Sequence, residues 1–289
     1  MVTAGTGGIG LETAIGLAAT GHHVTVVGRD VSRGRAAAER IGGATFVQAD
    51  LSSLDEVRAL AARLADDGPI DVLVNNVGAM FPDRTETADG IEASFAVNHL
   101  SPYLLTELLL DVVRGGRIVN VTSGAVRAAK NVFDEVDPPG GYYGFHWYGR
   151  AKLAHLAYTL DLAGRLRGTT AVFAADPGGA ATPMTDGTMR SPRIVKPGYR
   201  LLWPLVRRVF ERSTSGPASV AARPSLAAAT DPSLETGLVI GPRAVPVPAY
   251  RPSLDPRTVR AVLALTERVM SSRHGGPLQL DQQVGDRQS

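Results

Sequence analysis

The 289-residue chain has no cysteine, little lysine and no long apolar run. Without cysteine it can form neither a disulfide nor a thiolate metal site, which is compatible with a reducing cytoplasm. Lysine stands only at positions 130, 152 and 196, and the arginines are spread along the chain, which predicts a solvated surface and no nucleic-acid interface. A membrane-spanning helix needs about 18 apolar residues in a row, and neither such a run nor a basic-then-apolar leader is present. We therefore expect a cytoplasmic protein without a transmembrane segment or signal peptide.

Hydrophobic residues make up 44% of the chain, enough for one large α/β domain with a well-buried core. Strand-like apolar runs alternate with helical stretches, an order typical of a Rossmann-like, doubly wound parallel sheet with helices on both faces. We predict about seven strands, the first of them shortened. The domain is expected to cover residues 1–272, and the polar residues 273–289 to form a disordered tail. No metal site is expected, because His99 has no second ligand at a suitable spacing.

A glycine-rich stretch opens the chain. Gly5, Gly7 and Gly10 fit the pattern G-x-G-x-x-G, and residues 11–20 follow with a helical spacing of apolar side chains. Such a strand-to-helix turn brings a pyrophosphate close to backbone N–H groups at the start of a helix. The β-rich run at residues 23–28 completes a unit of the expected size, so we predict a dinucleotide site. Only residues 1–3 remain for the strand that precedes the turn.

The end of the second strand bears on which dinucleotide binds. NAD-binding units usually place an acid there to bond the ribose hydroxyls, whereas a 2′-phosphate prefers arginine. Gly28 followed by Arg29 therefore favours NADP(H), with Arg33 as a further candidate. Asp30 is acidic and only one residue further along, so NAD(H) stays open. The lack of an acid at Gly28 also argues against a methyl-donor site.

Polar residues mark the ends of later strands. Asp50 follows a strand at 44–47 and either accepts a hydrogen bond from an adenine amino group or is an ordinary loop residue. Residues 75–78, Asn-Asn-Val-Gly, either tie strand ends together near the cofactor or form a simple turn. Asn98 interrupts a helical pattern, which indicates a local role such as binding a water. Ser123 follows a strand at 117–121 and either polarises a substrate oxygen or caps a turn.

Tyr148 and Lys152 stand four residues apart in a helical stretch, so their side chains share one face. A free tyrosine titrates near pH ~10, too high for proton transfer at neutral pH, and a neighbouring positive charge lowers that value. Tyr142 and Tyr143 have no lysine at this spacing. The pair therefore predicts a proton-transfer site, although a chance pairing on a helix is the plain alternative.

The chain resembles the short-chain dehydrogenase/reductase family over about residues 1–243 in the order and identity of its motifs, which are residues 3–10, Asp50, residues 75–78, Asn98, Ser123, Tyr148, Lys152 and Pro177-Gly178-x-x-x-Thr182. Residues 87–100 and 152–154 are most similar to the branch that contains the retinol dehydrogenases and the WW-domain oxidoreductase. Ala4 stands where the family has its first glycine, and Val77 where it usually has alanine.

The resemblance implies hydride transfer between the nicotinamide ring and a carbinol or carbonyl carbon of a small hydrophobic alcohol, aldehyde or ketone. Tyr148 would exchange the hydroxyl proton, and Lys152 would hold the ribose and lower the pKa of the tyrosine. Ser123 would steady the substrate oxygen, and Asn98 would anchor a relay water. The residues implied around the cofactor are Thr3, Gly5, Thr6, Gly8, Ile9, Gly10, Arg29, Asp50, Leu51, Asn76, Val77, Gly78, Tyr148, Lys152, Pro177, Gly178 and Thr182.

Residues 183–213, with the apolar stretch 201–206, are expected to form a lid that selects the substrate. Because Arg207 and Arg208 follow this stretch, an exposed apolar lid also fits a partner-binding or membrane-surface patch. A homodimer is compatible with these features. Two other functions stay open, a non-catalytic dinucleotide-binding scaffold and a reductase of a carbon–carbon double bond on the same fold.

Overall fold

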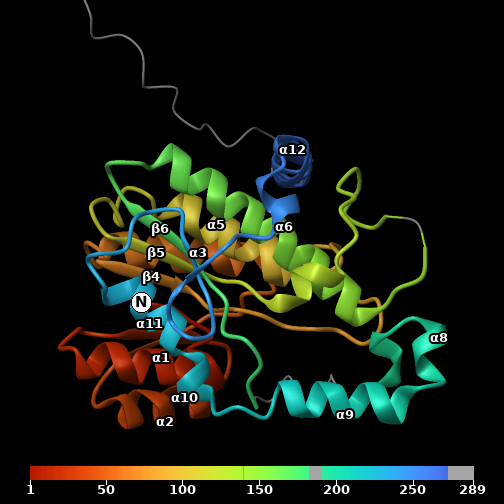
Figure 1. Ribbon diagram of the computed structural model, residues 1–289. Coiled ribbons are helices and arrows are strands. Elements are labelled where there is room, and N and C mark those ends of the chain that lie inside the picture. The colour runs from red at the N-terminus through yellow and green to blue at the C-terminus, as the bar shows by residue number, and fades with distance from the viewer. Residues whose placement is uncertain (139, 182–190, 273–289) are drawn as a thin grey trace, which may run out of the picture.

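The computed structural model of the chain describes residues 1–138, 140–181 and 191–272, and one sheet runs through them (Figure 1). Its eight strands lie in the order β3-β2-β1-β4-β5-β6-β7-β8, with β1 to β7 parallel and β8 antiparallel to β7. The strands are β1 Val2–Thr3, β2 Thr25–Gly28, β3 Thr45–Gln48, β4 Val72–Asn75, β5 Arg117–Val121, β6 Ala171–Ala175, β7 Val239–Ile240 and β8 Pro246–Val247. The predicted Rossmann-like sheet is confirmed. It exceeds the predicted seven strands because Pro246–Val247 adds an edge strand.

Strand β1 is short, as predicted, and yet it lies inside the sheet. Val2 pairs with Val26 of β2 on one side and with Val74 of β4 on the other, and it has no exposed surface. The amino group of Met1 donates a hydrogen bond to the carbonyl oxygen of Val72 at 2.7 Å, and burial lowers its pKa to about 6. Neighbouring strands on both sides thus hold the start of the glycine turn in place.

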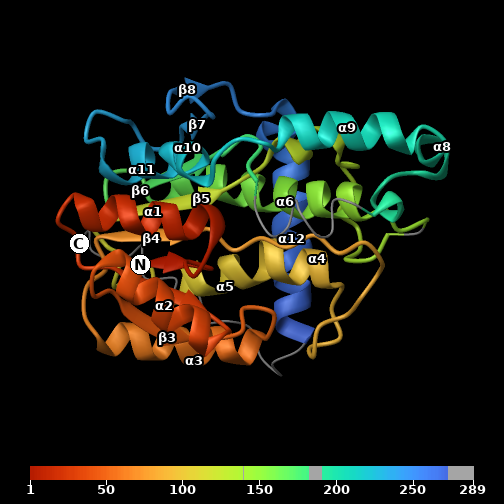
Figure 2. The ribbon, with the colours of Figure 1, turned by 90° about the horizontal axis from the view of Figure 1, so that it is seen from below.

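Helices cover both faces of the sheet (Figures 1 and 2). One face carries α1 Gly8–Ala19, α2 Val31–Ile41 and α11 Arg223–Thr230, and the other carries α3 Leu54–Asp66, α5 Ser101–Leu108 and α6 Gly144–Arg165, with α12 Pro256–Ser272 packed on α6. Successive strand residues point to opposite faces. Val26 and Val74 accordingly belong to the core under α1 and α11, whereas Val27 and Leu73 belong to the core under α3, α5 and α6.

Short helices connect these layers. The turn α4 Ala93–Phe95 continues through a π-helical turn, Ala96–Leu100, into α5. Among the described residues, 3-10 helices span Gly124–Ala128, Pro192–Ile194 and Arg251–Leu254. Between β6 and β7 lie α8 Pro197–Arg200, α9 Trp203–Ser213 and α10 Ala218–Ala221. Because β1 to β6 are parallel, the loops at their carboxyl ends meet along one edge of the sheet.

Candidate active site

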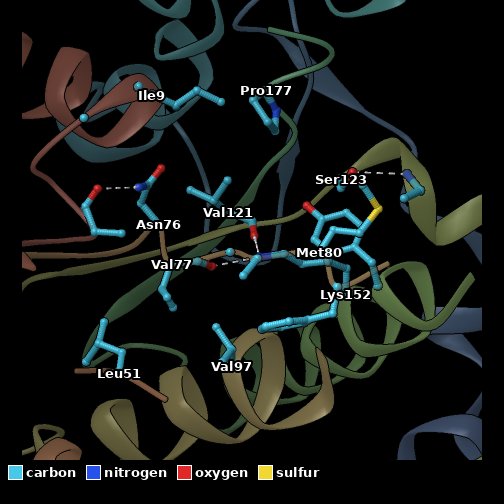
Figure 3. Close-up of a pocket in the computed structure, with 18 of the residues that line it drawn as sticks. Ile9, Leu51, Asn76, Val77, Met80, Val97, Val121, Ser123, Lys152 and Pro177 are labelled. Carbon is cyan, nitrogen blue, oxygen red and sulfur yellow. Dashed lines mark hydrogen bonds between the residues drawn. The ribbon is translucent and has the colours of Figure 1, made fainter. Parts of the chain in front are cut away.

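A cavity of about 1060 Å³ opens at this edge (Figure 3). Its volume lies at the upper end of what ligand sites usually enclose, which leaves room for a dinucleotide and a small second molecule. Many of the residues predicted from the sequence form its wall, namely Thr6, Gly8, Ile9, Arg29, Asp50, Leu51, Asn76, Val77, Gly78, Ser123, Tyr148, Lys152, Pro177 and Gly178. Thr182 lies outside the described residues. Thr3, Gly5, Gly10 and Asn98 are not part of this wall.

The glycine turn contributes Gly7 and Gly8 to the wall, where α1 begins. Gly8 has φ of +53°, a left-handed conformation that favours glycine. Gly7 caps the helix without a side-chain hydrogen bond. The first backbone N–H groups of a helix have no intrahelical acceptor, so this end of α1 is suited to hold an anion such as a phosphate.

Gly5 and Gly10, predicted as cofactor contacts, lie behind the wall and serve close packing. A Cβ atom on Gly10 would come within 2.5 Å of the Ala4 carbonyl oxygen, and one on Gly5 within 2.8 Å of Cγ1 of Val26. Neither position therefore has room for a side chain. Ala4 itself adopts φ of +49°, so the residue that stands in place of the family's first glycine keeps a glycine-like conformation.

Thr3, another predicted cofactor contact, also lies behind the wall. Its hydroxyl donates to the carbonyl oxygen of Val74 at 3.3 Å and accepts from the N–H groups of Asn76 at 2.9 Å and Val77 at 3.1 Å. The Asn76 amide returns a hydrogen bond to the Thr3 carbonyl oxygen at 3.1 Å. Thr3 thus ties the glycine turn to the loop after β4.

The far end of the cavity is lined by Arg29, Asp30 and Arg33. The Asp30 carboxylate accepts from the Arg33 N–H at 2.9 Å and caps α2, and this hydrogen bond lowers its pKa. A Cβ atom on Gly28 would lie 2.7 Å from Cγ2 of Thr6, so an acid at the end of β2 would not fit. The two arginines are therefore the basic groups nearest the strand end where a ribose phosphate would bind.

Asp50 lines the cavity as predicted, at the end of β3. Its carboxylate accepts from the N–H group of Ser52 at 2.9 Å and from the Ser52 hydroxyl at 2.8 Å. The backbone N–H of Asp50 donates to Glu56 at 2.7 Å. These bonds fix the orientation of a carboxylate that still has acceptor capacity toward the cavity.

Lys152 is 2% exposed and lies on α6 between two strand ends. Its Nζ atom donates to the carbonyl oxygens of Val121 at 2.9 Å and Val77 at 3.1 Å (Figure 3). Burial lowers the pKa of Lys152 to about 7. The side chain is thus held by backbone carbonyls, and near neutral pH it is close to losing its proton.

Tyr148 lies one helical turn before Lys152 on α6 and faces the same cavity. Burial raises the pKa of Tyr148 to about 12, while a hydrogen bond with Ser123 acts in the opposite direction. The charge of Asp176 raises the pKa further. Lys152 is not among the groups that shift the pKa of Tyr148 here, where burial has the largest effect, so the lowering expected from Lys152 stays a prediction.

Asn98 sits in the π-helical turn and is fully buried. Its side-chain oxygen accepts from the Ala79 N–H at 3.0 Å, and its amide donates to the carbonyl oxygens of Ala79 and Ser94, both at 2.8 Å. These bonds attach the loop after β4 to the helix below it. Both N–H groups of the Asn98 amide are thus engaged by backbone carbonyls, and the water-binding role stays a prediction.

Asp176 is a cavity residue that the sequence reasoning passed over. It follows β6 directly, and its carboxylate accepts from the N–H group of Gly178 at 3.0 Å. Burial raises the pKa of Asp176. The signal that singled out Asp50, an acid at the carboxyl end of a parallel strand, would also have identified Asp176.

Apolar side chains from distant segments close the cavity. Met80, Phe145 and Phe210 line it, and the rings of Phe145 and Phe210 lie 5.1 Å apart. In α9, Trp203, Val206 and Phe210 pack on the cluster that includes Met80 and Tyr148. The predicted lid thus contacts the site through α9, while its residues 183–190 lie outside the described part, as does the predicted tail 273–289.

The described residues contain neither a membrane-spanning helix nor a metal-binding cluster. Within residues 1–138, 140–181 and 191–272, none of the helices combines the length and the hydropathy needed to cross a bilayer. In the same part of the chain, no three His, Cys, Asp or Glu side chains gather in a way that would hold a metal ion.

Comparisons with known proteins agree with this geometry. The sequence profile of the family described as short chain dehydrogenase matches residues 1–192, which include the glycine turn, Ser123, Tyr148 and Lys152. Retinol dehydrogenase 12 of Mus musculus is 35% identical over 227 residues, which are 75% of this chain and 69% of that protein. Retinol dehydrogenase 12 of Homo sapiens is 38% identical over 189 residues, 62% of this chain and 60% of that protein, so less than two-thirds of the human protein is matched.

Solved structures are similar over more of the chain. An uncharacterized protein from Mycobacterium Paratuberculosis superposes with a TM-score of 0.74 at 28% identity and covers 93% of this chain and 91% of its own. The NADP active-site complex of Pseudomonas aeruginosa RhlG superposes with a TM-score of 0.64 at 25% identity, over 84% of this chain and 93% of its own.

Proposed function

The chain belongs to the retinol dehydrogenase-like branch of the short-chain dehydrogenase family and is therefore an NAD(P)-dependent oxidoreductase of alcohol and carbonyl groups, and we propose that it interconverts a hydrophobic alcohol and its aldehyde or ketone with NADP(H). One observation carries the proposal. Tyr148, Lys152 and Ser123 line the same cavity as the glycine turn at the start of α1.

The residues that would hold the dinucleotide follow from the cavity wall. The N–H groups at the start of α1 suit the pyrophosphate, and the Asp50 carboxylate suits the adenine amino group. Arg29 and Arg33 offer charged donors to a 2′-phosphate, and they outnumber the one carboxylate beside them, Asp30, which caps α2. Two of the three N–H groups of Lys152 are bound to backbone carbonyls, so the third suits a ribose hydroxyl.

Tyr148 would transfer the substrate's hydroxyl proton, and Ser123 would hold the substrate oxygen beside it. When bound, the nicotinamide supplies or accepts the hydride. With a pKa of about 12, the Tyr148 phenol is protonated at neutral pH, so it is ready to donate to a carbonyl oxygen. Oxidation of an alcohol would instead use the phenolate form of Tyr148.

The apolar wall supports a hydrophobic substrate. Met80, Phe81, Val97, Phe145 and Phe210 line the cavity, and burying an apolar side of the substrate against them is favourable. The names of the curated relatives point in the same direction, since retinol is a hydrophobic alcohol. The substrate class is inferred from this wall and these relatives together.

The test compares the wild-type protein with Tyr148→Phe and with Tyr143→Phe as the matched control, because Tyr143 is a neighbouring tyrosine of the same stretch. We expect Tyr148→Phe to abolish NADPH-dependent reduction of hydrophobic aldehydes and ketones while NADPH fluorescence still reports binding. Tyr143→Phe should keep activity. Turnover by folded Tyr148→Phe would refute the proton-transfer role.

Two other functions give different results in the same experiment. A non-catalytic scaffold would bind NADPH and turn over nothing in a broad alcohol and carbonyl panel. A reductase of carbon–carbon double bonds would leave the carbonyl of an unsaturated ketone intact, which product analysis by mass spectrometry and NMR detects. Tighter binding of NADH than of NADPH would refute the cofactor preference.

A further inference from the structure

The outer side of α8 and α9 exposes large apolar side chains. Tyr199, Leu201, Leu202, Leu205 and Val209 are 56%, 87%, 58%, 62% and 60% exposed, and we name these five residues the outer strip. In both ribbon views α8 and α9 lie at the edge of the molecule (Figures 1 and 2). Isolated exposed leucines are ordinary, but five large apolar residues within eleven positions form a patch.

The outer strip is not the surface that faces the cavity. Trp203, Val206 and Phe210, at a spacing of three and four residues, pack inward on the cluster around Tyr148. Leu205 and Val209, four residues apart, lie on a different side of α9, and the exposed Leu201 and Leu202 directly precede the helix. Helix α9 is thus apolar on two sides, and the inner side already has its packing partners.

The segment that carries the outer strip is rich in basic residues. Residues 191–213 contain one acid, Glu211, and six basic residues, which are Arg193, Lys196, Arg200, Arg207, Arg208 and Arg212. The whole chain has a formal net charge of only +2, so the remainder of the protein is net acidic and this segment is distinctly basic. Arg207 pairs with Glu211 at 2.7 Å, and Arg208 and Arg212 are exposed beside the strip.

The exposed apolar strip and the basic residues together indicate what binds to this surface. A second copy of the chain in a symmetric contact would bring the same basic segment against itself, which like charges disfavour. A substrate would enter the cavity on the inner side. An anionic bilayer surface satisfies both properties at once, because apolar side chains enter the acyl boundary while arginines meet the head groups.

We infer that α8 and α9 dock on the surface of an anionic membrane through the outer strip and its flanking arginines. Helix α9 then lies between the bilayer and the cavity, whose wall includes Phe210 and Thr214. The docking is peripheral. It needs no spanning helix, and it does not depend on the proposed function of the cavity.

The first test measures co-sedimentation of the full chain with vesicles of phosphatidylcholine alone and of phosphatidylcholine mixed in equal parts with phosphatidylglycerol. We expect binding to the anionic vesicles and little to the neutral ones. The triple variant Leu201→Ser, Leu205→Ser, Val209→Ser should lower the bound fraction roughly tenfold or more, and the double variant Arg208→Gln, Arg212→Gln should do the same on anionic vesicles.

Matched controls come from α12 and the turn before it. Leu254 is 56% exposed, and Arg257 and Arg260 are also exposed. Leu254→Ser and the double variant Arg257→Gln, Arg260→Gln should bind vesicles as the wild type does. If these controls lose binding to the same extent as the α9 variants, the attraction is a general property of the surface and the inference is overturned.

A second measurement keeps four of the five residues of the outer strip unchanged. Because the chain has no cysteine, Leu205→Cys carries the only thiol and can be labelled with an environment-sensitive fluorophore, with Ser32→Cys on α2 as the control. Anionic vesicles should shift the emission of the label at 205 to shorter wavelength and leave the label at 32 unchanged. No shift at 205, equal binding to neutral vesicles, or a self-association removed by the triple variant without any vesicle binding would each overturn the inference.

Discussion

The Nζ atom of Lys152 donates a hydrogen bond to the carbonyl oxygen of Val77 at 3.1 Å and so joins α6 to the loop after β4, 75 positions earlier in the chain. This bond holds an ammonium group in a buried place, where its pKa falls to about 7. The contact gives the cavity a charged donor whose protonation state depends on pH close to neutrality. Its consequences can be measured without any cofactor.

Lys152→Met should flatten the pH dependence of stability. Lys152 has a pKa of about 7 in the folded chain, against an ordinary lysine pKa of 10.5. Between these values the unfolded chain binds a proton that the folded chain has lost, so the free energy of unfolding of the wild type rises with pH. We expect a rise on the order of a few kcal/mol across this window. Urea unfolding at pH 7, 8 and 9 measures it, and equal slopes in the variant and the wild type would contradict the prediction.

Asp176→Asn should lower the pKa of Tyr148, because the negative charge of Asp176 raises it. Alcohol oxidation needs the phenolate, so the alkaline rise of kcat/KM should move to lower pH in the variant. The pH profile of oxidation measures this shift, and Asp176→Glu, which keeps the charge, should move the profile far less. A profile of Asp176→Asn that shifts to higher pH would show that the charge does not act on Tyr148.

Arg29→Gln and Arg33→Gln should each weaken NADPH binding more than NADH binding. A charge-assisted hydrogen bond is worth about 1.5–3 kcal/mol, which corresponds to roughly tenfold or more in Kd. Fluorescence titration with both dinucleotides measures the ratio of the two Kd values. Arg35→Gln on the same helix is the control, since Arg35 does not line the cavity. An unchanged ratio in both variants would rule out an arginine contact to the 2′-phosphate.

Ala4→Gly should stabilise the protein by about 1 kcal/mol, because a left-handed conformation strains alanine and not glycine. Ala4 has φ of +49°, and Ala244 has φ of +58° in the turn before β8. Ala244→Gly is therefore a matched control that should give a similar gain far from the cavity. Midpoints of urea unfolding measure both changes. A loss of stability in Ala4→Gly would mean that the methyl group of Ala4 contributes more by packing than the backbone costs.

Gly10→Ala should destabilise the turn by about 1–3 kcal/mol and weaken dinucleotide binding, because the new Cβ overlaps rigid groups. It would lie 2.4 Å from Nδ2 of Asn76 and 2.5 Å from the Ala4 carbonyl oxygen. Gly7→Ala is the milder comparison, since its Cβ would meet only the flexible end of Arg33, at 3.3 Å. Thermal unfolding and NADPH titration of both variants measure the difference, and equal effects would refute the packing role of Gly10.

Much of the fold could be predicted because its signals are local. Apolar, β-rich runs indicated the strands, and the predicted strand at 117–121 agrees with β5. The edge strand β8 was missed because two residues that include a proline carry no recognisable strand pattern. Its pairing with β7 depends on a turn and on the neighbouring strand.

The candidate site, like the fold, could be predicted from the sequence only in part. The spacing of Gly5, Gly7 and Gly10 and the four-residue separation of Tyr148 and Lys152 are properties of neighbouring residues, so they could be read directly from the amino-acid order. Which of these residues reach the cavity could not. Gly10 was predicted to touch the cofactor and instead packs behind the wall, because that outcome depends on where Asn76 lies in the folded chain.

Short stretches of sequence were thus enough to predict the motifs, the alternation of strands and helices, and the family. Within such stretches the geometry of the chain alone relates one side chain to the next. Burial, hydrogen-bond partners and electrostatic neighbours come from segments far apart, and only folding brings them together. That is why the pKa values of Tyr148 and Lys152, the part played by Asp176 and the two apolar sides of α9 had to come from the three-dimensional arrangement.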